Sequence, residues 1–444
     1  MKEVKVLGFD LGASSGRAIL GSFDGQKIAL DELHRFANDP VMVHDTLYWD
    51  ILRLLHEIKQ GILKSQSKSI SGISIDTWGV DFGLIDKNGK MLENPVHYRD
   101  TRTRGMEEEA TSRMHAVEIY RRTGIDFMFF NTLLQLLSLS VKRPHMLERA
   151  DKLLYTPDLL KYFLTGEIGN EFTIASTSQI LNPTQNKYDE DICRVMGIPI
   201  RIFPDIVSPG TVTGTLMPGI CEELGVGAIP FITTASHDTA AAVAAVPAKD
   251  DNHLYISCGT WSLLGIESDT AVINEKSEVY NLKNIGGVEN KFLPQKNVMG
   301  LWLLQESRRQ WAKEGQDMGF ADLNELAARS EKFKSFVDPD DMVFADPGNM
   351  PERIRDYCAK TSQETPWDKG ATVACILQSL AMKYRYVMEK IGYVCGRTFD
   401  TIHIVGGGTQ NRLLCQMTAN ATGKRVLAGP VEATALGNIA MQLK

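Results

Sequence analysis

The stretch VKVLGFDLGASSGRAILGSFD, from Val4 to Asp24, decides the fold. Two mostly apolar runs of strand length flank the turn residues ASSG, and a third run, KIALDELHRF, follows the turn DGQ. Short runs separated by Gly, Ser and Asp are typical of antiparallel strands joined by tight turns. The sequence therefore begins with a predicted meander of three antiparallel strands.

A helix and a buried strand are predicted next. The segment WDILRLLHEIKQGIL, residues 49–63, has apolar residues at helical spacing, at positions 51, 54, 55, 58 and 62. Such a helix can cover one face of the meander. The almost wholly apolar segment SISGISID, residues 69–76, indicates a strand buried in the same sheet.

The same order of elements recurs later in the chain. HLYISCG and SLLGIESD form a second hairpin around GTW, and a long predicted helix, residues 371–391, precedes the strand TIHIVGGG. The repeat predicts two related α/β halves joined by the polar linker PAKDDN, residues 247–252. Because 444 residues exceed one ordinary core, we expect two domains, 1–246 and 247–444, with a ligand cleft between them.

Composition excludes several classes of protein. The formal net charge of −7 argues against a nucleic-acid-binding surface. No apolar segment follows a basic start, and no window is apolar enough to span a bilayer, so we expect a cytoplasmic protein that contacts no membrane. The seven cysteines are scattered and never form C-x-x-C, which predicts reduced thiols without a zinc site or disulfides.

Two turns and a glycine cluster are candidates for phosphate binding. In GFDLGASSGR, Asp10 ends a strand and precedes a Gly- and Ser-rich turn and Arg17, groups that suit Mg²⁺ and phosphate oxygens. The second hairpin presents Gly259 and Thr260 at the equivalent bend, and GGGTQN, residues 406–411, follows a strand. Neither a Walker loop nor G-x-G-x-x-G occurs, and each segment also fits an ordinary tight turn.

The segment SIDTWGVDFGLID is a candidate for polyol binding. It contains the carboxylates Asp76 and Asp81 with Trp78 and Gly79 between them. Carboxylates accept hydrogen bonds from sugar hydroxyls, and an indole ring stacks on a carbon face. The alternative is a strand, a turn and a strand with Trp78 in the core.

A histidine and a carboxylate begin the alanine-rich run ASHDTAAAVAAV. The run indicates a helix entered from the apolar strand PFITTA, with His237 and Asp238 at its start. Asp is a frequent N-cap, so Asp238 is either only a cap or a proton acceptor presented at the helix N-terminus.

Taken in order, these segments resemble the FGGY family of carbohydrate kinases over essentially the whole chain. The motifs that carry the resemblance are DLGASSGR, IDTWGVDF, YRDTRT, ASHDTA, GTWSLLG, NVMGLWLLQ, HIVGGGTQN and GPVEATALGNI. The resemblance implies an actin-like ATPase fold, in which two RNase H-like α/β domains flank a central cleft. The N-terminal domain, 1–246, would then bind the sugar and carry the first phosphate turn, and the C-terminal domain, 247–444, would bind the nucleotide.

The resemblance also implies which residues act. ATP and its phosphates would be contacted by Ala13, Ser14, Ser15, Gly16, Arg17, Thr260, Asn297, Gln305 and Gly407. The sugar would be contacted by Gly79, Ser236, His237 and Asp238. Asp238 would be the general base, and Asp10 would organise Mg²⁺. Cys258 stands in the second phosphate turn where serine is more familiar in the family, so we expect its oxidation to inhibit.

The implied activity is phosphoryl transfer from ATP to the C1 hydroxyl of L-rhamnulose. IDTWGVDF, SHDTA and MGLWLLQ separate the chain from the glycerol and xylulose kinases of the family. One alternative is a kinase for another ketose, such as L-fuculose or D-xylulose, and another is a non-catalytic actin-like nucleotide-binding regulator. The expected partners are the sugar and MgATP, and the chain is expected as a monomer or homodimer.

Overall fold

The computed structural model describes residues 3–444, which form two compact units. Unit 1 comprises the chain up to Ala245 together with Glu267–Pro294 and Thr434–Lys444. Unit 2 comprises Val246–Ile266 and Gln295–Ala433. Sequence order alone predicts one boundary after residue 246. In the structure the chain also returns to unit 1 twice, with residues 267–294 and with the C-terminal helix.

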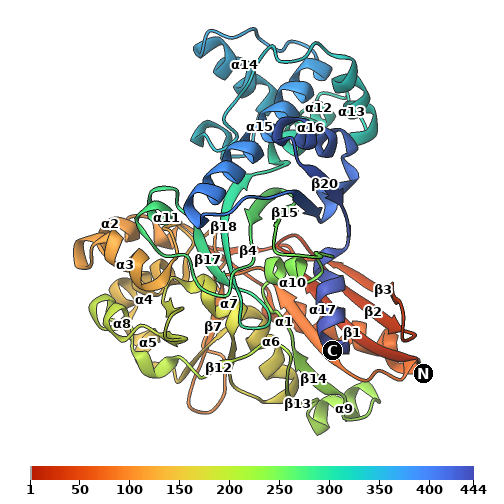
Figure 1. Cartoon of the computed structure of the whole chain (residues 1–444). Coiled ribbons are helices and arrows are strands. Elements are labelled where there is room, and N and C mark those ends of the chain that lie inside the picture. The colour runs from red at the N-terminus through yellow and green to blue at the C-terminus, as the bar shows by residue number, and fades with distance from the viewer. Residues whose placement is uncertain (1–2) are drawn as a thin grey trace. The chain divides into compact units, whose positions relative to one another are not determined.

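Unit 1 is built on a six-stranded sheet in the order β13-β14-β6-β1-β2-β3 (Figure 1). Its strands are β1 (Val4–Leu11), β2 (Ser15–Phe23), β3 (Ile28–Ala37), β6 (Ile73–Thr77), β13 (Thr211–Thr215) and β14 (Pro230–Thr233). Strands β1, β2 and β3 are antiparallel neighbours, which confirms the predicted meander. Strand β1 runs parallel to β6, and β6 runs parallel to β14.

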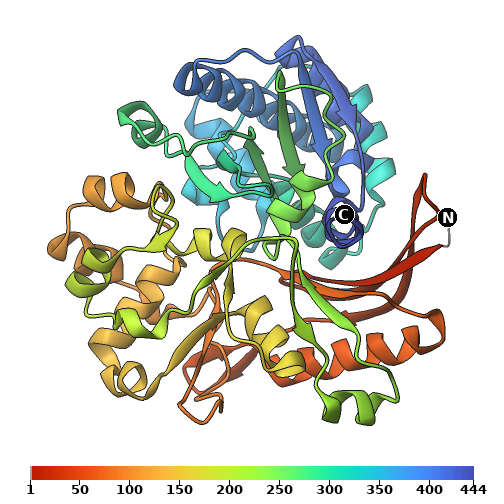
Figure 2. The same cartoon turned by 60° about the horizontal axis from the view of Figure 1, so that its bottom comes forward.

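Two helices cover the two faces of this sheet. Helix α1 (Ile51–Ser65) lies where a Cβ on its Gly61 would come within 2.6 Å of the Phe9 ring. Helix α17 (Ala433–Leu443) lies on the other face, where the missing side chain of Gly21 leaves room for Ile439. Figure 2 shows α1, in orange, along the strands and the C-terminal helix on their opposite side. The predicted helix over residues 49–63 is thus confirmed.

The rest of unit 1 is mainly helical and has a second apolar core, which includes Leu133, Leu137 and Ile174. Its helices are α2 (Met106–Arg113), α3 (Ala116–Thr123), α4 (Thr132–Lys142), α5 (Pro144–Arg149), α6 (Thr156–Thr165), α7 (Phe172–Ala175), α8 (Glu190–Met196), α9 (Pro218–Leu224), α10 (Asp238–Ala244) and α11 (Glu275–Val279). Short strand pairs are β4 (Val41–Val43) with β5 (Thr46–Tyr48), β7 (Phe82–Ile85) with β8 (Lys152–Tyr155), β9 (Asn170–Glu171) with β12 (Ile206–Val207), and β10 (Leu181–Asn182) with β11 (Lys187–Tyr188).

Unit 2 has its own sheet, in which β18, β16, β15, β19 and β20 follow one another. These strands are β15 (His253–Cys258), β16 (Trp261–Gly265), β18 (Phe292–Met299), β19 (Thr401–Val405) and β20 (Arg425–Ala428). Strand β17 (Lys283–Gly286), next to β18, is counted with unit 1. The helices are α12 (Trp302–Lys313), α13 (Phe320–Arg329), α14 (Met350–Lys360), α15 (Lys369–Cys395) and α16 (Arg412–Thr422).

The two sheets share one topology. In unit 1 an antiparallel hairpin, β1 and β2, is followed by the parallel neighbours β6 and β14. In unit 2 the hairpin β15 and β16 is followed by the parallel neighbours β19 and β20. This correspondence confirms the predicted repeat of the order of elements and the predicted class, two α/β domains of the RNase H-like type. All seven cysteines are free thiols, as predicted.

Among residues 3–444, no helix has both the length and the apolar character required to cross a membrane.

Candidate active site

Parallel strands of unit 1 carry acidic residues to one edge of the sheet. Asp10 on β1 and Asp76 on β6 are register partners. At the end of β6, the Thr77 N–H donates to the Ser236 carbonyl at 2.9 Å, which brings the start of α10 and Asp238 to the same edge. Burial, and after it the charge of Asp10, raises the pKa of Asp76, and the charge of Asp238 acts in the same direction. The predicted base and the predicted Mg²⁺ residue therefore meet at one place in unit 1.

The C-terminal helix completes this edge. Asn438 Nδ2 donates to Asp76 Oδ2 at 2.7 Å, and Gln442 Nε2 donates to Asn438 Oδ1 at 2.9 Å. Asp76 is fully buried, and its Oδ1 has no hydrogen-bond partner in the described part of the chain. Sequence analysis assigned no role to Asn438. Nothing local to residue 438 indicates a partner 362 positions away.

The turn that is predicted to bind phosphate, residues 12–15, is held by Asn38, which lies outside the motifs. Gly12 N–H donates to the Ser15 carbonyl at 2.9 Å and closes the turn. Asn38 stabilises this turn through two hydrogen bonds. Its Nδ2 donates to the Gly12 carbonyl at 2.8 Å, and its N–H donates to the Ser14 carbonyl at 3.1 Å. Ala13 and Ser14 are exposed at the tip. The turn is thus rigid at its base and open at its tip.

Gly16 and Arg17 follow the turn on β2. A Cβ on Gly16 would lie 2.3 Å from the Phe36 ring, so glycine is required there. Arg17 is the register partner of Asp10, and its Nη2 lies 2.5 Å from Asp10 Oδ2. The guanidinium and the carboxylate therefore stand together beside the turn.

The residues present fit the way in which proteins usually hold Mg²⁺. Mg²⁺ is commonly bound through one or two carboxylates, with waters and substrate phosphates as the other ligands. The Asp10 side chain is 12% exposed and adjoins the phosphate turn, which suits that arrangement. No cluster of three His, Cys, Asp or Glu ligands occurs in residues 3–444, so the chain offers no all-protein cage. The assignment of Mg²⁺ to Asp10 stays a prediction.

Asp238 is not the N-cap of its helix. His237 holds the N-cap position, and Asp238 is the first helical residue. Asp238 Oδ1 accepts from the Thr239 N–H at 2.6 Å and from Thr239 Oγ1 at 3.2 Å. The side chain is 35% exposed, and burial raises its pKa to about 6. The carboxylate is therefore mostly ionised at neutral pH and is available as a proton acceptor.

His237 is buried beside Asp238 and Gly79. Its Nε2 lies 3.4 Å from Asp238 Oδ1, while its Nδ1 has no partner among the described residues. Burial lowers the pKa of His237 to about 4, so the ring is neutral at neutral pH. A Cβ on Gly79 would lie 3.2 Å from Thr177 and 3.4 Å from the His237 ring. The structure thus brings together the predicted sugar residues Gly79, His237 and Asp238.

Glu171 anchors the loop before Asp238. Its Oε2 accepts from the Ser236 N–H at 3.1 Å and from Thr173 Oγ1 at 2.6 Å. Thr173 Oγ1 in turn accepts from the His237 N–H at 3.2 Å. Burial raises the pKa of Glu171 to about 7. Sequence analysis missed this residue because its segment contains no motif.

The backbone next to Gly79 is strained. Val80 has φ 71°, a left-handed conformation that costs a β-branched residue about 1–3 kcal/mol. The Val80 N–H donates to Thr177 Oγ1 at 3.2 Å, and Thr132 Oγ1 donates to the Val80 carbonyl at 2.7 Å. Two threonines from different helical segments therefore hold the turn that presents Gly79.

Unit 2 joins two of the predicted nucleotide residues directly. Thr260, at the exposed tip of the β15–β16 turn, donates its hydroxyl to Gln305 Oε1 on α12 at 3.0 Å. The start of α12 also holds the turn, because the Gly300 N–H donates to the Thr260 carbonyl and the Leu301 N–H to the Gly259 carbonyl, both at 3.0 Å.

Asn297 and Gly407 lie elsewhere on the same unit. Asn297 is on β18 in register with Leu263, and its Oδ1 is buried without a partner in the described residues. Gly407 follows β19 and is exposed, with nothing within 4 Å of the place where a Cβ would be. Their part in nucleotide binding stays a prediction.

Comparison with known families agrees with this geometry. Residues 5–244 match the N-terminal domain of the FGGY family of carbohydrate kinases, and residues 254–444 match its C-terminal domain. The chain belongs to the FGGY family of carbohydrate kinases. It is therefore a member of a family of enzymes that phosphorylate sugars with ATP.

Individual FGGY relatives cover nearly the whole chain. A rhamnulokinase of Bacteroides thetaiotaomicron is 44% identical over 98% of this chain and 89% of its own length. A rhamnulokinase of Oceanobacillus iheyensis is 42% identical over 98% of this chain and 92% of its own length. Among solved structures, a gluconate kinase from Lactobacillus acidophilus superposes with a TM-score of 0.81 at 16% identity, over 99% of this chain and 89% of that chain. The last comparison supports the fold alone.

In the FGGY motif IDTWGVDF, Asp81 and Trp78 pack in the core, although the motif's carboxylates suggested contact with a polyol. Asp81 is 1% exposed and accepts from Trp49 Nε1 at 2.6 Å, Trp78 Nε1 at 3.0 Å and Gln135 Nε2 at 3.1 Å. Trp78 is itself 6% exposed. The prediction that Asp81 and Trp78 contact a sugar is wrong, because their polar atoms are satisfied inside the core, and the alternative with Trp78 in the core is correct.

The burial of Cys258 bears on its predicted sensitivity to oxidation. The thiol is 2% exposed, and burial raises its pKa. Oxidants react with exposed thiolates, which form readily only where the pKa is low. The environment of Cys258 therefore argues against a redox switch in this FGGY kinase.

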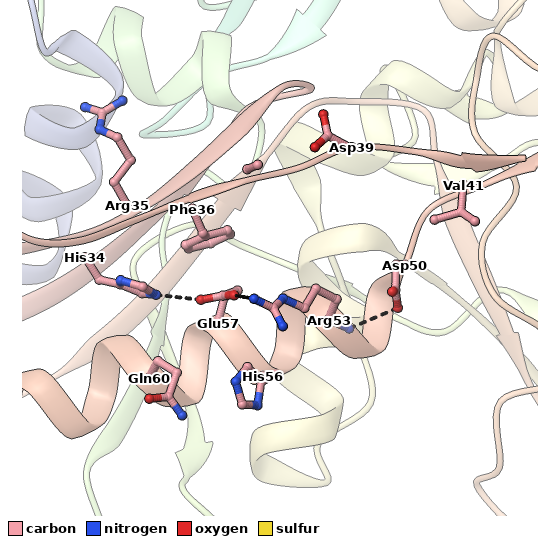
Figure 3. Close-up of a pocket in the computed structure, with 11 residues that line it drawn as sticks. His34, Arg35, Phe36, Asp39, Val41, Asp50, Arg53, His56, Glu57 and Gln60 are labelled. Atoms are coloured by element: carbon pink, nitrogen blue, oxygen red, sulfur yellow. Dashed lines mark hydrogen bonds and ion pairs between the residues drawn. The ribbon is translucent and has the colours of Figure 1, made fainter.

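A pocket of about 590 Å³ in unit 1 lies beside the predicted phosphate-binding residues, because its lining residues Arg35, Phe36 and Ala37 are register partners of Arg17, Gly16 and Ser15. It is lined by residues of β3, α1 and the segment between them, and Figure 3 shows His34, Glu57, Arg53 and Asp50 facing one another. Glu57 pairs with His34 Nε2 at 2.6 Å and also with Arg53, and Asp50 caps α1 by accepting from the Arg53 N–H. His34, Glu57, Arg53 and Asp50 therefore each have a partner within the pocket.

Proposed function

We propose that this chain transfers the γ-phosphoryl group of ATP to the C1 hydroxyl of L-rhamnulose, giving L-rhamnulose 1-phosphate and ADP. The observation that carries the proposal is the position of Asp238, an ionised carboxylate at the same sheet edge as the Asp10 and Arg17 pair. Phosphoryl transfer needs an acceptor hydroxyl, a nearby base and groups that bind the phosphates. The rhamnulokinase relatives support the choice of sugar.

In this proposal each group of unit 1 has one task. Asp238 accepts the proton of the attacking hydroxyl, a contribution of about 10²- to 10⁴-fold for a positioned base. Neutral His237 orients Asp238 or bonds the sugar, and Gly79 leaves space for the sugar beside it. Arg17 binds a phosphate oxygen through its planar guanidinium.

The proposed nucleotide residues are divided between the units, with Ala13 to Arg17 on unit 1 and Thr260, Asn297, Gln305 and Gly407 on unit 2. Thr260 and Gln305 present a fixed hydroxyl and amide, and Gly407 offers open backbone for close approach. When bound, Mg²⁺ would neutralise phosphate charge, with Asp10 as the residue that holds it. The proposal includes a cytoplasmic enzyme that acts as a monomer or a homodimer.

The test is an ADP-release assay with MgATP against a panel of ketoses and polyols. L-Rhamnulose should give the highest kcat/KM. A tenfold preference for L-fuculose, D-xylulose or glycerol would overturn the assigned sugar and leave the kinase class intact. If the folded protein binds MgADP but releases no ADP with any of these compounds, the result would instead favour a non-catalytic regulator.

A further inference from the structure

The hydroxyl of Tyr384 lies beneath the β15–β16 turn of unit 2. Tyr384 is fully buried in α15, and its Oη lies 2.7 Å from Ser262 Oγ and 3.7 Å from Cys258 Sγ. Ser262 Oγ also donates to Cys258 Sγ at 3.6 Å. Cys258 and Ser262 are register partners on β15 and β16, with Gly259 and Thr260 as the bend between them. The hydroxyl therefore contacts both ends of the turn that presents Thr260.

Cys258 connects this turn to the glycine loop after β19. A Cβ on Gly408 would lie 2.2 Å from Cys258 Sγ, and a Cβ on Gly406 would lie 3.1 Å from the Cys258 carbonyl. The thiol thus fills the space directly beneath the loop, and only glycines allow that approach. Gly407, between the two, stays exposed and uncovered. A shift of Cys258 would consequently displace Gly407.

Ser262 makes the corresponding connection to α12. A Cβ on Gly300 would lie 2.5 Å from Ser262 Oγ, so the serine packs closely against the residues that begin α12. The Gly300 N–H donates to the Thr260 carbonyl at 3.0 Å, and α12 carries Gln305, the partner of the Thr260 hydroxyl. A change at Ser262 would therefore alter the position of Thr260 both through its bond from Gly300 and through its bond to Gln305.

A buried hydroxyl loses its hydration, which is unfavourable unless it is hydrogen-bonded. Phenylalanine would fill the same volume in α15 without that cost. Burial raises the pKa of Tyr384, so the phenol keeps its proton and stays able to donate. The hydroxyl thus supplies a directed contact between the helix and the two turns, in addition to the packing that the ring supplies.

We propose that Tyr384, acting through Ser262 and Cys258, is a positioning residue for the nucleotide, because it holds the 258–262 turn and the 406–410 loop in fixed relation. The inference rests on the proposed function for the role of these turns in nucleotide binding. Tyr384 itself touches no substrate in this account.

The test compares Tyr384→Phe with Tyr386→Phe, a matched change on the same helix at a residue that is 50% exposed. MgADP binding is measured by calorimetry, and KM values are measured for MgATP and for the ketose. For Tyr384→Phe we expect MgADP binding and KM for MgATP to worsen by about 5- to 20-fold, as for a lost buried hydrogen bond that leaves its partner unsatisfied. KM for the ketose and all values for Tyr386→Phe should stay within about twofold of wild type.

Ser262→Ala provides a second variant in case Tyr384→Phe does not fold. It should also weaken MgADP binding. The double variant should bind MgADP as tightly as the weaker-binding of the two single variants, because both substitutions remove the same Ser262–Tyr384 hydrogen bond. Unchanged MgADP affinity in either single variant overturns the inference. Equal losses for nucleotide and ketose that follow a lower Tm also overturn it, since the role would then be merely structural. A wild-type protein that fails to bind MgADP overturns the proposed function, and this inference with it.

Discussion

The N–H of Thr77 donates to the carbonyl of Ser236 at 2.9 Å and continues the parallel pairing of β6 beyond the last residues of β14. Together with the bonds from the Ser236 N–H to Glu171 and from the His237 N–H to Thr173, this bond fixes where the chain enters α10. It places Asp238 at the carboxyl end of the sheet, where Asp10 and Asp76 already stand as register partners. The position of the proposed base is therefore a consequence of sheet topology.

The first prediction concerns Asp238→Asn. Asn keeps the shape and can still accept from the Thr239 N–H through its amide oxygen, so the folded protein should be as stable as wild type. It cannot accept the substrate proton, and kcat should fall by about 10²- to 10⁴-fold with KM for MgATP near wild type. Asp50→Asn, at the N-cap of α1, is the control and should leave kcat unchanged. Turnover of the Asp238 variant within a few-fold of wild type would contradict the base assignment.

The second prediction concerns the pH dependence of kcat. A general base must be ionised to act, and burial raises the pKa of Asp238 to about 6. The rate should therefore be constant above that pH and should fall about tenfold per pH unit well below it. Steady-state rates from pH 5 to 8 with both substrates saturating measure this profile. A rate that is flat down to pH 5 would show that a group of lower pKa, or none, limits the reaction.

The third prediction concerns Gly79→Ala. The added methyl group would lie 3.2 Å from Thr177 and 3.4 Å from the His237 ring, in space that we assign to the sugar. KM for L-rhamnulose should rise, by about tenfold for a contact worth 1 to 2 kcal/mol, while KM for MgATP stays near wild type. Gly219→Ala is the control, because nothing lies within 4 Å of its added Cβ. Equal effects of the two substitutions would remove Gly79 from the sugar site.

The fourth prediction concerns stability and Glu171. Its pKa is raised by burial from 4.5 to about 7 in the folded protein, so the folded state holds a proton that the unfolded state has lost between these pH values. The free energy of unfolding should therefore fall as pH rises through this window, and Glu171 should account for about 1 to 3 kcal/mol of that fall. Asp81, with a pKa raised by burial to about 6, adds a fall in the same direction.

Urea unfolding at pH 5 and pH 7 measures this effect. Glu171→Gln should reduce the difference between the two pH values, and Glu167→Gln, at an exposed position nearby, should leave it as in wild type. A Glu171 variant with the full wild-type difference would mean that the carboxyl group does not hold its proton in the folded state.

The sequence by itself determined the local elements and the family. Alternating apolar runs and turn residues predict the β1–β3 meander, and helical spacing predicts α1, because both patterns depend only on neighbouring residues. The repeated hairpin, helix and strand predicted the common topology that the two sheets display. The motifs also predicted which residues of the two turns bind phosphate, and that assignment stays a prediction.

Only the tertiary structure decided which of those residues are free for chemistry and which support others. In the sequence, Asp81 is a carboxylate like Asp76 and Asp238. In the structure it is enclosed by Trp49 and Gln135, which donate from distant segments, and by Trp78 of its own motif. Asn438 donates to Asp76, and Asn38 donates to the Gly12 carbonyl. The residues next to each asparagine in the sequence do not predict these partners. Hydrogen bonds between segments far apart in the chain depend on strand order and on helix docking, which form only when the apolar faces are buried together.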